Sequence, residues 1–443
     1  MLALPAAKDR TFRVIGQGPS GRAAADALAA SGATVTVWDD DAARREAATH
    51  IAKGPRASLD GVDGVVLCDG GVGTCGKQMV TKAKSAGVRV LTDIDLFHEA
   101  IEAIPAKDRP RLVAVSGGAG KSVTAALIVH IAEAAGRTVT SVGDPSRPFL
   151  AMKRPARGDL VVCELPMPRL SITRRLSCDA SVLVGLGVGM ERNRNVALGA
   201  ILRLVRNQKR TGLCVVAVDD PFGQQVCMAL QAGAHQADAG EIVPVSGSEA
   251  IGHGVFLIGG AAYSIRDGRT NILGEFSRAA AVQSAPMREN AAAAIALALS
   301  LDVSPAQIMK SLHDFQGLPG RLQTVAEEGR VLIIDDSYAR SPRAVELAIR
   351  SSGDVFWIGG TPPARRPKRM HGVYELARCD DQDAMTEALD RATTDATRFA
   401  AEHEGSAPVV LFSPGVATDP AVFRRVVAAH LDEGAEAPGD SHV

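Results

Sequence analysis

The chain has 443 residues, 46% hydrophobic and 22% charged, which suffices for several hydrophobic cores and argues against a disordered protein. Its 49 lysines and arginines against 50 aspartates and glutamates give a formal net charge of -1. That balance excludes a global attraction to nucleic acid or an anionic membrane and favours small-molecule partners. No run approaches the ~18 consecutive apolar residues of a membrane span, and the seven scattered cysteines form no C-x-x-C pair, so we expect a cytoplasmic protein with free thiols.

The first hundred residues alternate short apolar runs with helical stretches, the pattern of a parallel α/β domain. Strands are expected at residues 12–15, 34–38, 62–67 and 88–91, and helices at 22–30 and 77–85. Residues 104–110 interrupt the pattern with two prolines and three charged residues. We therefore predict a first domain over residues 1–108.

Residues 109–318 are predicted to form a second α/β domain. Its strands are expected at 112–115, 160–163, 181–184 and 214–218, followed by hairpin-like runs within 240–278 and an Ala-rich helix at 289–300. After a break at 316–320, a third α/β domain is predicted over 319–432, with strands at 322–327, 330–334, 355–358 and 409–412 and a final helix at 420–431. Residues 433–443 are expected to form a flexible tail.

A glycine-rich turn separates the first strand from the first helix and reads Gly16-Gln17-Gly18-Pro19-Ser20-Gly21. We call residues 16–21 the N-terminal glycine turn. It matches G-x-G-x-x-G, the fingerprint of dinucleotide-type sites, and Asp39 ends the next strand where such sites have an acidic residue. The backbone of such a turn approaches a phosphate closely, and the helix N-terminus favours its charge. The turn predicts a nucleotide diphosphate site at Gly16, Gly18, Ser20, Gly21 and Asp39; a tight turn without a ligand is the alternative.

A second glycine-rich loop, residues 116–122, reads Ser116-Gly117-Gly118-Ala119-Gly120-Lys121-Ser122 and precedes an Ala-rich helix. We call it the phosphate loop. It has the short G-x-x-G-K-S form, because Val115 stands where the longer Walker motif has its first glycine. Backbone N–H groups of the loop and the helix dipole would hold phosphates, Lys121 would neutralise their charge, and Ser122 would bind magnesium.

The phosphate loop resembles the T-G-T-N-G-K-S/T signature of the Mur ligase family. The order of the surrounding motifs resembles that family over nearly the whole chain, and in particular its D-glutamate-adding members. The resemblance implies an α/β fold of three domains. A Rossmann-like N-terminal domain would bind the UDP of a UDP-muramoyl substrate, a P-loop ATPase-type central domain would bind ATP, and a Rossmann-like C-terminal domain would bind the amino acid. It also implies a monomer that makes an amide through an acyl phosphate.

The resemblance assigns roles to individual residues. Glu164 matches the magnesium-binding glutamate of the family, so Ser122 and Glu164 would form one metal site. Catalysis is then expected from Lys121, Glu164, Arg321 and Asp336. ATP would contact the loop residues Gly117, Gly118, Gly120, Lys121 and Ser122, together with Asn290, Arg321 and Asp336. The N-terminal glycine turn and Asp39 fall on the UDP-binding positions.

Other family positions are changed in this sequence. Gly189 stands at the place of the histidine that binds the second magnesium ion, and residues 200–207 contain no lysine that could form a carbamate. The second metal site is therefore expected to be absent. A guanidinium group could replace part of its charge, and the candidates are Arg192, Arg203 and Arg206.

The amino-acid site also departs from the family pattern. Tyr338 replaces the lysine of the N-D-S-K motif, which leaves D-glutamate specificity open. The basic residues within 365–369 follow shortly after Gly359 and Gly360. They are interpreted either as a solvated loop or as an anion site beside the amino-acid pocket.

Three functions compete on these observations. The first is an ATP-dependent ligase that joins an amino acid or amine to a carboxylate. The second is a relative without ligase activity that binds nucleotide or UDP-sugar as a regulator or scaffold, as the missing second metal site suggests. The third is a pyridine-nucleotide oxidoreductase based on the N-terminal glycine turn, which leaves the phosphate loop unexplained.

Overall fold

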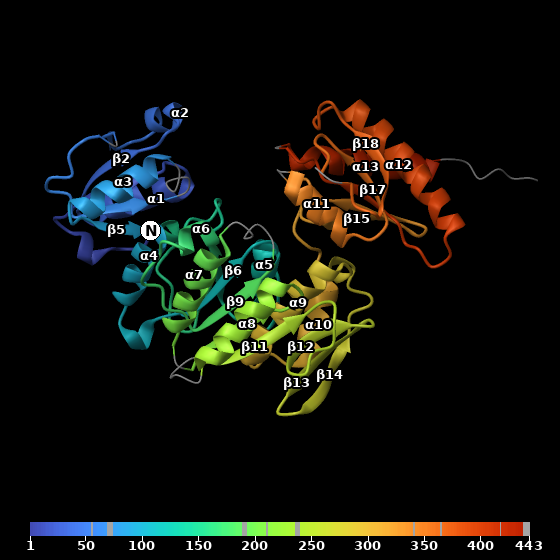
Figure 1. Ribbon diagram of the computed structural model, residues 1–443, viewed down its shortest axis with the longest axis horizontal. Helices are drawn as coiled ribbons and strands as arrows, with labels where there is room; N and C mark the ends of the chain where they lie inside the picture. Colours follow the sequence, from blue (N-terminus) through green and yellow to red (C-terminus); the bar gives the residue numbers. More distant parts are fainter. Residues whose placement is uncertain are drawn as a thin grey trace, which may run out of the picture. The chain divides into compact units, whose positions relative to one another are not determined.

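The computed structural model describes residues 1–54, 56–68, 74–187, 193–209, 211–234, 240–339, 342–363, 366–416 and 418–436. It is an α/β protein with three β-sheets (Figure 1), as the sequence predicts. The chain forms two compact units, Met1–Glu275 with Glu289–Ser311 and Phe276–Arg288 with Leu312–Val443. The boundaries at 108/109 and 318/319 stay predictions. None of the described helices combines the length and the apolar character needed to cross a bilayer.

The first sheet has five parallel strands in the order β3-β2-β1-β4-β5. Most of its β-branched and aliphatic strand residues are buried because helices cover the sheet. The four predicted strands are confirmed, and the sheet has one additional short edge strand, β3. The strands are β1 (Thr11–Ile15), β2 (Thr34–Trp38), β3 (Ile51–Ala52), β4 (Gly64–Leu67) and β5 (Arg89–Thr92). The helices are α1 (Pro19–Ala30), α2 (Ala42–Glu46), α3 (Thr74–Ser85) and α4 (Asp93–Glu102).

The second sheet has nine strands in the order β14-β13-β12-β11-β10-β9-β6-β8-β7. Strands β12 to β14 pair in antiparallel fashion and form the hairpin-like end, while the other pairs are parallel. The strands are β6 (Arg111–Gly117), β7 (Val139–Val142), β8 (Leu160–Pro166), β9 (Ala180–Val184), β10 (Leu213–Ala217), β11 (Glu241–Ser246), β12 (Gly254–Ile258), β13 (Ala261–Arg266) and β14 (Arg269–Glu275).

Helices α5 (Lys121–Ala134), α6 (Met167–Leu170) and α8 (Pro221–Ala234) pack against strands of this sheet, and α7 (Arg194–Arg206) packs against α6 and α8 (Figure 1). The 3-10 turn η4 (Phe149–Ala151) contacts α1 and α4. Two further helices, α9 (Ala285–Ser300) and α10 (Pro305–Asp314), have residues in both compact units. Residues from the first and second sheets belong to one hydrophobic cluster, to which Phe97 of α4 and Phe149 of η4 contribute with ring centroids 5.1 Å apart. The first unit therefore has a core that is continuous across its two sheets.

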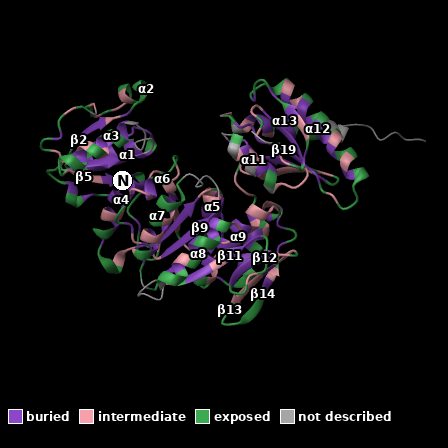
Figure 2. Ribbon diagram, viewed as in Figure 1, coloured by how far each residue is buried: buried purple, intermediate pink, exposed green. Residues whose placement is uncertain are grey.

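The third sheet, in the second unit, has the order β15-β16-β19-β17-β18, parallel except for the β15·β16 pair. Each face has its own hydrophobic cluster, and the central strands β16, β17 and β19 are buried, as Figure 2 shows for β19. The strands are β15 (Gln323–Glu328), β16 (Val331–Asp335), β17 (Val355–Gly359), β18 (Met370–Glu375) and β19 (Val409–Phe412). The helices are α11 (Pro342–Ser351), α12 (Gln382–Glu402) and α13 (Pro420–Glu436).

Candidate functional site

The phosphate loop joins β6 to α5 at the carboxyl ends of the parallel strands, where ligands bind in such sheets. Two of its glycines have left-handed backbone angles, φ +132° at Gly117 and φ +84° at Gly120. A Cβ atom on Gly117 would lie 1.9 Å from the Val184 carbonyl oxygen, and one on Gly120 would lie 2.2 Å from Asn290 Oδ1. The loop therefore packs so closely against β9 and α9 that only glycine fits.

The predicted side chains of this loop lie at the start of α5. Lys121 Nζ donates to the carbonyl oxygens of Gly118 at 2.6 Å and Gly117 at 3.3 Å, so the ammonium group lies across the loop. Ser122 Oγ donates to Glu164 Oε1 at 2.9 Å. This contact follows from strand register, because β8 pairs with β6 and places Glu164 opposite Val115.

A buried glutamate that the sequence analysis missed adjoins the loop. Glu289, at the residue before Asn290, accepts a hydrogen bond from the Gly185 amide at 2.8 Å. Burial raises the pKa of Glu289 to about 7, Asp219 and Asp220 act in the same direction, and the Gly185 bond opposes them. The signal in the sequence was a single acidic residue one position before Asn290 and the alanine run of α9, where the helix is buried.

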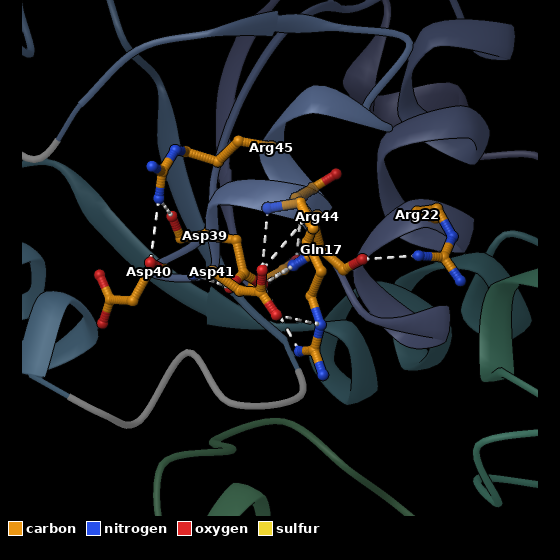
Figure 3. Close-up of polar contacts among 9 residues, drawn as sticks. Gln17, Arg22, Asp39, Asp40, Asp41, Arg44 and Arg45 are labelled. Atoms are coloured by element: carbon orange, nitrogen blue, oxygen red, sulfur yellow. Dashed lines mark hydrogen bonds and ion pairs between the residues drawn. The ribbon is translucent and has the colours of Figure 1, made fainter.

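The N-terminal glycine turn has the close packing that its motif predicts. Gly16 has φ +94°, and a Cβ atom on Gly21 would lie 1.7 Å from the Gly16 carbonyl oxygen. Asp39 accepts from the Gln17 amide at 2.6 Å and, with its other oxygen, from the Asp41 amide at 2.8 Å (Figure 3). Asp39 therefore holds the turn against the end of β2.

Three arginines that the sequence analysis did not single out border this turn (Figure 3). Arg22 donates to the Gln17 carbonyl at 2.8 Å, and Arg44 Nη1 lies 3.7 Å from Asp39 Oδ2. Arg45 donates to the Asp39 carbonyl at 2.8 Å and its guanidinium lies 4.6 Å from the centre of the Trp38 ring. Three guanidinium groups thus border the turn beside the carboxylates of Asp39, Asp40 and Asp41, and they offer hydrogen-bond donors to an anionic ligand.

In the second unit, the remaining predicted residues meet at the carboxyl end of β16. Asp336 accepts from Ser413 Oγ at 3.0 Å and from the Leu322 amide at 3.3 Å. Burial raises the pKa of Asp336 to about 7 despite these bonds, and the neighbouring Asp335 adds to the rise. The Arg321 guanidinium lies 4.9 Å from the centre of the Tyr338 ring.

The structure limits the hypothesis that an arginine replaces the second metal ion. Arg203 donates to the carbonyl oxygens of Thr173 at 3.0 Å, Ser171 at 2.9 Å and Leu170 at 3.2 Å, so its guanidinium is engaged at the end of α6. Arg206 is exposed on α7. Residues 188–192, which include Gly189 and Arg192, lie outside the described residues.

The basic segment of the third sheet lies away from the Asp336 cluster. Arg366 donates to the carbonyl oxygens of Met370 and His371, at the beginning of β18. Asp336 and Ser413 follow the carboxyl ends of β16 and β19, and the third sheet's parallel strands run in one direction. Arg366 therefore lies at the amino end of β18, whereas Asp336 and Ser413 follow carboxyl ends, and the two interpretations of the basic segment stay predictions. Arg365 lies outside the described residues.

The fold and the site define an α/β protein with a phosphate loop in its large sheet. No family model matches the chain. The UDP-N-acetylmuramoylalanine–D-glutamate ligase of Phenylobacterium zucineum (strain HLK1) is 34% identical over 372 residues, which cover 82% of this chain and 78% of that protein. The ligase of the same name from Caulobacter sp. (strain K31) is 31% identical over 417 residues, covering 92% and 86%.

Relatives with that name extend over most of the chain. The Brucella abortus (strain 2308) protein is 29% identical over 444 residues, covering 94% of this chain and 93% of its own. Among solved structures, the UDP-N-acetylmuramate–alanine ligase from Thermotoga maritima has a TM-score of 0.49 at 16% identity, covering 96% and 99%. Because relatives at 34% and 31% identity cover most of its length, the chain belongs to the Mur ligase family.

Proposed function

We propose that the chain is an ATP-dependent ligase that joins an amino acid or amine to the carboxylate of a UDP-muramoyl substrate through an acyl phosphate. The observation that carries the proposal is the Ser122 Oγ to Glu164 Oε1 contact of 2.9 Å at the start of α5, beside Lys121. A hydroxyl and a carboxylate oxygen beside a phosphate-binding loop are what a magnesium-dependent phosphoryl transfer requires.

The phosphate loop would hold the ATP phosphates. The amino end of α5 offers its positive dipole end, and Lys121, which now contacts loop carbonyls, would turn to the phosphate oxygens. Ser122 and Glu164 would hold a magnesium ion, whose charge reduces the repulsion between the γ-phosphate and the incoming carboxylate. Among the residues that the structure describes, no group of three or more His, Cys, Asp or Glu side chains is arranged to hold a metal ion.

The N-terminal glycine turn would bind the UDP part of the substrate. The amino end of α1 and the nearby guanidinium groups of Arg22, Arg44 and Arg45 favour a diphosphate. Asp39 supports this site by holding the turn, since both of its oxygens accept from backbone amides. Asn290, next to Gly120, would also contact ATP. Arg321 and Asp336 of the second unit are proposed to contact ATP as well.

A second candidate function is nucleotide or UDP-sugar binding without ligation. It is favoured by α7, where the only cations within residues 200–207 are Arg203 and Arg206 and where Arg203 is engaged by carbonyl oxygens. Without a lysine carbamate, one metal site would have to support acyl-phosphate formation, and losing a full positive centre slows such a step.

The first prediction is that ATP turnover depends on the phosphate loop. The purified protein is assayed for ADP release with magnesium, with and without UDP-N-acetylmuramoyl-L-alanine and a panel of amino acids. We expect turnover that requires both substrates, and a fall of at least ~100-fold in Lys121→Ala, because the phosphate charge is then unbalanced. Lys107→Ala, at an exposed position outside the loop, is the matched control and keeps its rate. ATP binding without turnover would support the second candidate.

A further inference from the structure

A buried arginine connects the N-terminal glycine turn to the central sheet of the first unit. Arg169, in α6, is 7% exposed and forms an ion pair with Asp93 of α4, which is 1% exposed. Its Nη1 also lies 3.3 Å from Ser20 Oγ in the turn, and its Nη2 donates to the Gly143 carbonyl at 3.4 Å. The first unit contains the first sheet with its helices, here called the first-sheet part, and the second sheet with its helices, here called the second-sheet part. One guanidinium group thus contacts both parts.

Further hydrogen bonds surround this ion pair. Thr92 Oγ1 and Thr173 Oγ1 are 2.9 Å apart, and Asp95 Oδ1 accepts from the backbone amides of Arg174 at 2.9 Å and Arg175 at 3.1 Å. Thr92 and Asp95 also cap the start of α4. Because these groups are buried or partly buried, their bonds add directional constraints to the hydrophobic contact between the two parts.

The segment that carries Arg169 is itself fixed from the other side. Arg203 of α7 donates to three carbonyl oxygens of residues 170–173. The same segment continues directly from β8, which carries Glu164 beside Ser122. A short stretch of chain, residues 164–173, therefore links the phosphate loop to the N-terminal glycine turn.

We propose that Arg169 is a positioning residue that fixes the N-terminal glycine turn relative to the phosphate loop. This inference rests on the proposed function. In that function, Arg169 keeps the carboxylate of the UDP-bound substrate in position to react with the γ-phosphate of ATP, and Arg169 itself contacts neither substrate. Reacting groups must be held within ~0.5 Å of their productive geometry, and small misplacements cost large factors in rate. The two binding sites are built from other residues, so the arginine acts on the turnover number and leaves the affinities unchanged.

The test compares Arg169→Met, Arg169→Lys and the control Arg13→Met by kinetics, calorimetric titration and thermal unfolding. Arg13 is another buried arginine, bonded to Thr36, Ala57 and Ser58 within the first-sheet part alone. We expect Arg169→Met to lower kcat ~10- to 100-fold per folded molecule, with the Kd values for UDP-N-acetylmuramoyl-L-alanine and ATP within ~2-fold of wild type. Arg169→Lys should recover part of the rate, because lysine keeps the pair with Asp93, and Arg13→Met should keep kcat.

A double variant and a thermal unfolding experiment complete the test. If Arg169→Met does not fold, the double variant Asp93→Asn, Arg169→Met leaves no uncompensated buried charge and takes its place. In thermal unfolding, we expect the first-sheet part to unfold separately in the variant and together with the second-sheet part in wild type. An unchanged kcat, or a raised Kd as the sole effect, would overturn the role. If the wild-type protein has no turnover, the proposed function fails, and the unfolding arm alone decides whether Arg169 couples the two parts.

Discussion

Glu289 and Asp336 show how single residues carry an energetic cost that their neighbours only partly offset. Each has a pKa raised to about 7, first by burial, although each accepts hydrogen bonds from nearby groups. In the unfolded chain both carboxyl groups titrate near pH 4. Ionisation at neutral pH therefore weakens the folded state, and these residues are candidates for function because such strain persists at sites that use it.

At the scale of one residue, we predict that Glu289→Gln removes a pH dependence of stability. Wild-type Glu289 keeps its proton in the folded state from about pH 4.5 to 7, while the unfolded chain loses it, so this group lowers stability as the pH rises through that window. The glutamine side chain of the variant cannot ionise and keeps an acceptor for the Gly185 amide. Chemical denaturation should show the variant more stable by on the order of 2–3 kcal/mol at pH 8 and no gain near pH 4. Equal pH profiles would contradict the assigned pKa.

Some site residues could be found from the sequence and others could not. Lys121 and Ser122 were predictable because the motif that contains them is local and its glycines fix the backbone. Arg169 was not, since its partners are far away in sequence: Asp93 is 76 residues distant and Ser20 is 149. The residue type of a buried arginine does not predict which carboxylate forms an ion pair with it.

Among the elements, a strand followed by a glycine loop and a helix forms each of the two proposed phosphate sites. The loop must turn sharply at the end of the strand and still direct its N–H groups to a ligand, so glycines occur where side chains would collide. This requirement explains why the strand-to-helix junctions after β1 and β6 were predicted well. The antiparallel β12 to β14 end of the large sheet was predicted only as hairpin-like runs, because short strands alone do not reveal their neighbours.

We predict that Gly120→Ala disrupts the phosphate loop. The residue has φ +84°, and the new Cβ would lie 2.2 Å from Asn290 Oδ1, so both backbone strain and a collision oppose the change. The free energy of unfolding should fall by at least ~1–2 kcal/mol, and ATP affinity should fall ~10-fold or more. The measurements are denaturant titration and calorimetric binding.

The control for this variant is Gly199→Ala. Gly199 lies on the exposed side of α7 and an added Cβ would meet no atom within 4 Å. Alanine is the better helix former, so we expect a gain of ~0.5–1 kcal/mol and unchanged ATP affinity. A stable Gly120→Ala protein with normal ATP affinity would show that the loop tolerates a side chain.

At the scale of the whole molecule, the chain divides into two compact units with separate hydrophobic clusters. Each unit also contains one of the two carboxyl groups whose pKa is raised to about 7. We predict two thermal unfolding transitions, both of which move to lower temperature between pH 5 and 8. Glu289→Gln should flatten the pH dependence of one transition and Asp336→Asn that of the other. A single transition that responds to both variants would show that the units unfold together.

Local periodicity and short motifs suffice to predict the α/β class, most strand positions, the two glycine loops and the resemblance to Mur ligases. Which distant residues come into contact follows only from the packing of the folded chain. The Ser122 contact with Glu164 depends on β8 pairing with β6, and the Glu289 contact with Gly185 joins residues 104 apart. These contacts depend on strand order and helix packing, which are set by burial of apolar residues from the whole chain. A local sequence pattern does not show which other strand a given strand will pair with.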